Sequence, residues 1–83
     1  MSYVFITERW VFKCTEERER ISCLKFGADG QFFRAIGIAR INGKYYVFDD
    51  TNTEFHSNCT LLGAMKQYIE KKYGKIENVI ARD

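Results

Sequence analysis

An Asn-Gly pair at positions 42 and 43 constrains the fold of this chain more than any other local feature. It separates two runs rich in apolar and aromatic residues, 31–41 and 44–48. Asn and Gly both tolerate the positive φ angles of a two-residue type I′ turn, so the pattern predicts a β-hairpin. The expected cross-strand pairs are Ile41 with Lys44, Arg40 with Tyr45, Ala39 with Tyr46, Ile38 with Val47 and Gly37 with Phe48.

This register sorts the side chains of the hairpin onto two faces. One face mixes small and large residues, namely Phe33, Ala35, Gly37, Ala39, Ile41, Tyr46 and Phe48. Small residues beside large ones leave a trough in which a helix can pack, so we expect this face to point toward the core. The other face, expected to be exposed, carries Phe32, Arg34, Ile36, Ile38, Arg40, Tyr45 and Val47.

Alternation of apolar residues with a period of two continues on both sides of the hairpin. It predicts one long strand over residues 3–14, bent near Glu8 and Arg9. Strand character resumes at 21–26, after a charged tip at 15–20, and a short final strand is expected at 76–81. The sequence does not place this last strand in the sheet.

Between residues 60 and 73 the apolar residues recur at steps of three and four, which predicts a helix. The stripe consists of Leu61, Leu62, Met65, Tyr68, Ile69 and Tyr73. Ser57 or Asn58 can cap the N-terminus of this helix, and Gly74 can end it in a left-handed conformation.

The predicted element order is therefore ββββαβ, in a single α+β domain over residues 1–83. We expect an antiparallel sheet of four to five strands with one helix packed on one face. The length allows one hydrophobic core, and the hydrophobic content of 46% is enough to build it.

We expect no secretory leader, because the first residues lack a basic segment followed by an apolar one, and no apolar run is long enough to span a bilayer. We therefore expect a cytoplasmic protein without membrane association. The three cysteines, Cys14, Cys23 and Cys59, are an odd number, and we expect them to be reduced thiols.

Side chains that could carry chemistry are few. Nucleophilic catalysis by Cys59 with His56 would also need an orienting group and an oxyanion hole, which the sequence does not supply. The acidic segment 49–54 lacks the glycine and the distal glutamate of a calcium loop, and the cysteines lack paired zinc-site spacing. We expect no enzyme activity, no cofactor and no metal, with an enzyme using Cys59 and His56 as a remaining alternative.

The exposed face of the hairpin is the strongest candidate for a binding site. The candidate partner-binding residues are Phe32, Arg34, Arg40, Lys44 and Tyr45. We expect a protein partner, held by this face or by an edge strand, with a homodimer as a further option. A small chain without catalytic residues is typical of stoichiometric inhibitors that viruses and mobile elements direct against host machinery. The alternative is nucleic-acid binding, because aromatic and basic side chains together bind single strands.

Overall fold

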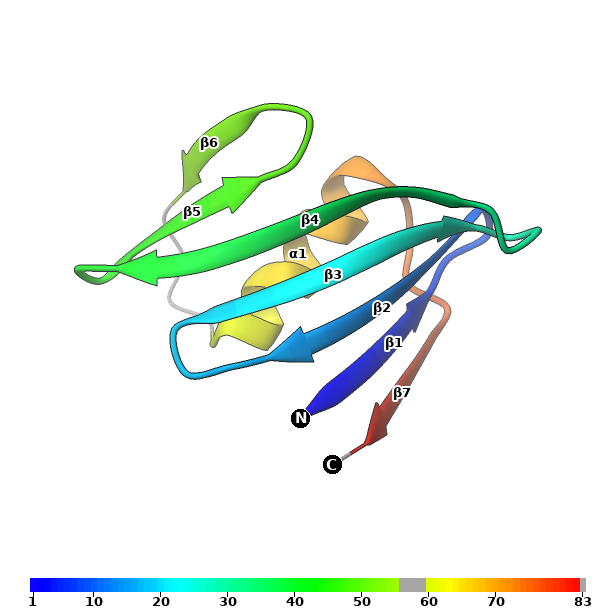
Figure 1. Ribbon diagram of the computed structural model, residues 1–83, viewed down its shortest axis with the longest axis horizontal. Helices are drawn as coiled ribbons and strands as arrows, with labels where there is room; N and C mark the ends of the chain where they lie inside the picture. Colours follow the sequence, from blue (N-terminus) through cyan, green and yellow to red (C-terminus); the bar gives the residue numbers. More distant parts are fainter. Residues whose placement is uncertain (56–59, 83) are drawn as a thin grey trace.

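The computed structural model describes residues 1–55 and 60–82, and within them it shows seven strands and one helix (Figure 1). The strands are β1 (Ser2–Ile6), β2 (Trp10–Glu16), β3 (Arg20–Gly27), β4 (Phe32–Ile41), β5 (Lys44–Phe48), β6 (Asn52–Phe55) and β7 (Asn78–Arg82). The helix α1 (Leu61–Lys72) lies across one face of a single sheet of order β6-β5-β4-β3-β2-β1-β7. All neighbouring strands are antiparallel.

The predicted α+β class with an antiparallel sheet and one helix is confirmed, but the prediction of four to five strands is wrong. The long strand expected over 3–14 is two strands, because the chain turns at Thr7. There the amide of Thr7 donates to the carbonyl of Trp10 at 2.9 Å, and the amide of Trp10 donates to Thr7 Oγ1 at 3.0 Å. The other additional strand is β6, which forms in the polar segment that follows β5.

The hairpin of β4 and β5 has the predicted turn and register. Asn42 and Gly43 have φ angles of 52° and 76°, as a type I′ turn requires. Ile41 lies opposite Lys44, and Gly37 lies opposite Phe48. The final strand, which the sequence leaves without a place, pairs with β1, so that Ile80 lies opposite Val4.

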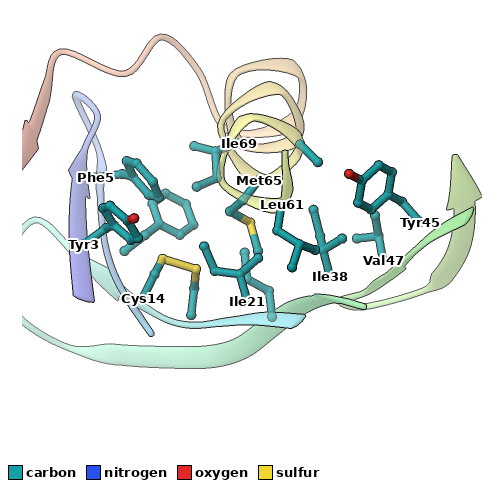
Figure 2. Packing of buried hydrophobic residues seen from close by; sticks show 14 residues of the cluster. Tyr3, Phe5, Cys14, Ile21, Ile38, Tyr45, Val47, Leu61, Met65 and Ile69 are labelled. Atoms are coloured by element: carbon teal, nitrogen blue, oxygen red, sulfur yellow. A yellow bond between two sulfur atoms is a disulfide. The ribbon is translucent and has the colours of Figure 1, made fainter. Parts of the chain in front are cut away.

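The helix packs on the other face of this hairpin from the one predicted. The side chains directed at α1 are Ile36, Ile38, Tyr45 and Val47, and all four are buried (Figure 2). They join Phe5, Phe12, Ile21, Met65, Ile69 and the other members of one core cluster. The neighbouring strand decides which face is buried: Ile38 and Ile36 lie opposite Ile21 and Cys23 of β3, and these four side chains form one continuous apolar row beneath the helix.

The helix ends at well-defined caps. Thr60 is the N-cap, and its Oγ1 accepts a hydrogen bond of 3.1 Å from the amide of Gly63. The two residues predicted for this role, Ser57 and Asn58, lie outside the described residues. Gly74 follows the helix with a φ of 119°, which confirms the left-handed C-terminal residue. In the described part of the chain, no helix combines the length and the apolar character needed to cross a membrane.

Cys14 and Cys23 are joined by a disulfide across β2 and β3 (Figure 2). The two residues lie directly opposite each other in the register, and both are buried in the core. The expectation of three reduced thiols is therefore wrong for this pair, because the register brings the two sulfur atoms together. Cys59 lies outside the described residues.

We expect the double variant Cys14→Ala/Cys23→Ala to lose about 2 to 3 kcal/mol of unfolding free energy. The disulfide closes a loop with a sequence separation of 9, and loop-closure entropy for about ten residues gives that magnitude. Urea unfolding with and without reductant measures it. Reductant should weaken the wild-type protein by a similar amount and leave the double variant unchanged. A wild-type protein that is indifferent to reductant would contradict the assignment.

Candidate functional site

The face of the sheet turned away from α1 is not covered by the helix, and we call it the open face. The side chains on it include Val4, Lys13, Leu24, Phe26, Phe32, Ala35, Gly37, Ala39, Ile41, Lys44, Tyr46 and Phe48. Large apolar members remain about half exposed: Leu24 at 46%, Phe32 at 53%, Ile41 at 49% and Phe48 at 45%. Apolar surface gathered on one side of a small domain is typical of an interaction site.

The open face is basic at its margins. The strand registers place Arg20, Lys44 and Arg82 near the ends of their strands, and they place Lys13 between Val4 and Leu24 in the middle of the face. Among the strand positions of this face that the structure describes, Glu54 is the single acidic one. Arg20 also forms an exposed ion pair with Glu17, at 3.4 Å. The face therefore presents an apolar centre within a positive rim.

A row of small residues crosses the open face from strand to strand. Ser2 lies opposite Thr15, Thr15 opposite Ser22, and Ser22 opposite Gly37. We call this row the transverse groove. A hollow of about 410 Å³ lies along Ser2, Thr15 and Ser22 of this row, and on its one bank it is also lined by Val4, Lys13, Leu24 and Ala35.

The five residues that the sequence nominated for partner binding do not share one surface. Phe32 and Lys44 lie on the open face, whereas Arg34, Arg40 and Tyr45 lie on the side of the helix. Tyr45 is only 3% exposed and is part of the core (Figure 2). The five residues therefore do not form one surface. The hairpin directs its isoleucines toward the core, and Arg34, Arg40 and Tyr45 lie on that same side of the strands.

The two arginines on the side of the helix have acidic partners. Arg40 Nε donates to Glu19 Oε2 at 3.1 Å, and Arg34 Nη1 lies 3.6 Å from Asp49 Oδ1. The open-face residues that sequence reasoning missed, Lys13, Ser22 and Leu24, belong to β2 and β3. The alternation in 21–26 indicates which residues face outward: apolar Ile21 and Cys23 flank Ser22, so Ser22 lies on the opposite face from them.

A buried carboxylate, that of Asp49, ties the end of β5 to the C-terminal end of α1. Its side chain is 0% exposed. Oδ2 accepts hydrogen bonds from the hydroxyls of Tyr68 and Tyr73 and, at 3.1 Å, from Lys72 Nζ. Among the described residues, Oδ1 has no hydrogen-bond partner, although Arg34 Nη1 lies 3.6 Å from it. The arrangement fixes the helix on the sheet and lies on the opposite side from the open face.

Burial and hydrogen bonding act in opposite directions on the pKa of Asp49. Burial by itself raises the pKa, but hydrogen bonds from Tyr68, Tyr73 and Lys72 outweigh it, so the pKa is lowered from its ordinary value. Burial and hydrogen bonding also change the pKa of the Tyr68 hydroxyl. Burial has the larger effect, the hydrogen bond to Asp49 adds to it, and together they raise the pKa of Tyr68 to about 12. The carboxylate is therefore held in its charged form as an acceptor.

Lys25 is a second buried polar residue close to Asp49. It is 7% exposed, and its Nζ lies 4.4 Å from the ring centroids of both Trp10 and Tyr73. Burial lowers the pKa of this amine, and the nearby charge of Asp49 partly opposes the effect. Ring faces attract an ammonium group, so the contact stabilises the aromatic side of the core.

A second hollow, of about 730 Å³, lies between α1 and the strands β5 and β6. Its charged lining residues are Glu54, Lys71 and Lys72. Lys72 is already engaged by Asp49 and Asp50. Mixed and largely paired charge makes this hollow a weaker candidate than the open face.

Across residues 1–55 and 60–82, no three His, Cys, Asp or Glu side chains gather so that they could hold a metal ion. His56 and Cys59, the pair considered for catalysis, lie outside the described residues.

Comparison with known proteins finds no match among protein-family models, curated proteins or solved structures. A functional proposal therefore depends on the geometry and chemistry of the open face.

Proposed function

We propose that this protein is a non-enzymatic binding module that docks on another protein through its open face. The supporting observation is that a seven-stranded sheet has its helix on one face only, while the other exposes a basic-rimmed apolar centre. A module of this kind acts by occupying the surface of its partner, which is how a stoichiometric inhibitor works.

The exposed side chains favour protein over nucleic acid as the partner. Leu24 and Ile41, 46% and 49% exposed, are aliphatic and do not stack on bases. Protein interfaces bury such side chains together with aromatic ones at their centre. Nucleic acid is the alternative, because Phe32 and Phe48 could stack on bases beside Lys44.

We propose the cytoplasm as the compartment. Disulfides are uncommon there because soluble thiols reduce them. Cys14 and Cys23, however, are buried in the core, where a reductant reaches the sulfur atoms only after local unfolding.

Affinity capture with matched variants tests the proposal. We expect immobilised wild-type protein to retain a cell protein in stoichiometric amount, with or without nuclease. Leu24→Ser/Phe48→Ser should reduce the captured amount at least about tenfold, because central apolar contacts dominate such interfaces. Lys66→Ser/Lys71→Ser, on the exposed side of α1, is the control and should behave as the wild type.

Thermal unfolding of all three proteins shows whether the fold is retained, which the half-exposed positions of Leu24 and Phe48 allow. Capture that disappears with nuclease would replace the protein partner with a nucleic acid. Equal capture by the open-face variant would refute docking through this face.

A further inference from the structure

Building on the proposed function, we propose that the open face receives an acidic amphipathic helix of the partner protein, seated in the transverse groove. Three features of the described chain carry this inference: the shape of the groove, the completed hydrogen bonding of the sheet beneath it, and the sign of the surrounding charge.

The groove has the dimensions of a helix. Val4, Lys13 and Leu24 form one bank, two residues along the strands from the small row. On β3 the groove is also bounded on its other side, by Arg20, whereas it is open at the ends of β1 and β2. At about 3.4 Å per residue, Leu24 and Arg20 are about 14 Å apart along β3, which accommodates a helix about 10 Å in diameter.

The groove is also long enough for a short helix. It crosses four strands spaced about 4.8 Å apart, so it spans about 14 Å, or about ten residues of a helix. It meets a line of small residues along β4, namely Ala35, Gly37 and Ala39. This is the trough that the sequence suggests for a helix, and α1 leaves it vacant by packing on the opposite face.

A helix suits the face of a sheet better than an extended segment does. In the centre of the open face, β1 to β4 each pair with a strand on both sides. An extended peptide laid over them would bury its own amides and carbonyls without partners, which is costly. A helix satisfies these groups internally and can present an apolar stripe to the groove.

The rim selects an acidic partner. Lys13, Lys44 and Arg82 stand on the open face against Glu54 alone among the described strand residues there. Acidic residues flanking an apolar stripe would complement these cations. A second copy of this chain fits poorly, since two such faces would bring like charges together. The exposed side of α1 is also basic, with Lys66 and Lys71.

Selection from a displayed library of helix-biased peptides tests the proposal directly. We expect wild-type protein to enrich peptides with an apolar stripe at helical spacing flanked by Asp and Glu. An enriched peptide, once synthesised, should become helical when bound, as circular dichroism measures. Enrichment of basic, proline-rich or extended peptides, or no enrichment, would overturn the inference.

Matched variants locate the binding site of that peptide. Ser22→Tyr and Gly37→Leu fill the groove, and we expect each to weaken binding at least about tenfold. A Cβ at Gly37 would meet only the carbonyl oxygen of Ile21, at 3.4 Å, so the fold accepts the change. Ala81→Tyr adds the same bulk on the opposite side of the edge strand β7 and should leave binding unchanged.

Charge-reversal variants distinguish a specific contact with the basic rim of the open face from a general effect of net charge on binding. Lys44→Glu should weaken peptide binding at least about tenfold, whereas Lys66→Glu, with the same net charge, should change it little. Equal effects of the two would refute a specific rim.

The two proposals fail separately. Cell-protein capture that depends on Leu24 and Phe48 but survives Ser22→Tyr and Lys44→Glu refutes the helix in the groove and leaves the binding module standing. Capture that ignores Leu24 and Phe48 refutes both.

Discussion

Replacing Tyr45 with alanine is expected to lower the free energy of unfolding by about 3 to 5 kcal/mol, the range for truncating a large buried aromatic residue. Tyr45 is 3% exposed and packs in the core beside Val47. A domain of this size has a total stability of about 4 to 12 kcal/mol. Urea unfolding followed by circular dichroism should therefore show a variant that has lost about a quarter or more of its stability.

The adjacent tyrosine is the matched control. Tyr46 points to the open face, opposite Ala39, and is partly exposed. We expect Tyr46→Ala to cost no more than about 1 to 2 kcal/mol and to weaken partner capture instead. A larger loss of stability from Tyr46→Ala than from Tyr45→Ala would show that the faces are assigned the wrong way round.

Asp49→Ala should destabilise the fold by about 3 to 4 kcal/mol. It removes the acceptor shared by Tyr68, Tyr73 and Lys72 and leaves part-buried donors without a partner. Its neighbour Asp50 is exposed and contacts Lys72 from outside the core. Asp50→Ala should therefore change stability little in the same urea titration, and equal effects of the two variants would contradict a structural role for Asp49.

The lowered pKa of Asp49 also predicts the direction of the pH dependence. Stability from a carboxyl group whose pKa is lower in the folded state is complete above its unfolded value, near 3.8, and is lost as the pH falls through the folded value. We expect wild-type stability to fall below about pH 4. The decline should be shallower in Asp49→Ala, and parallel curves would assign the acid sensitivity to other groups.

Local signals made the hairpin and the helix predictable. Asn42 and Gly43 fix both the turn type and the loop length, and the register then follows by counting. The stripe from Leu61 to Tyr73 has a clear helical period and ends at Gly74. These features depend on residues close together in the chain, where the pattern and the physical cause coincide.

The number of strands is harder to predict, because the residues that face the core switch from odd to even positions between β1 and β2 without a visible break in the sequence. In β1 the core takes the odd positions Tyr3 and Phe5, whereas in β2 it takes the even positions Phe12 and Cys14. Val4 and Ile6 are apolar as well, so the sequence shows no break. Conversely, β6 has polar residues and forms by backbone pairing with β5, which leaves no hydrophobic signal.

Which face of the sheet stays open could not be predicted from the hairpin alone. Alternation shows which residues share a face, but not which face meets the helix. That choice depends on the neighbouring strand: Ile21 lies opposite Ile38 and Cys23 opposite Ile36, so their apolar row continues into the core. The same register aligns Cys14 with Cys23, and the disulfide follows from a pairing that the sequence does not display.

Strand β3 assigns two separate tasks to alternate residues. Ile21, Cys23 and Lys25 are buried and hold the domain together, whereas Ser22 and Leu24, one position away, are exposed on the open face. If the open face binds a partner as proposed, substitutions at Ser22 and Leu24 change recognition while Ile21, Cys23 and Lys25 keep the fold stable. A change of partner can then evolve by single substitutions, none of which unfolds the domain.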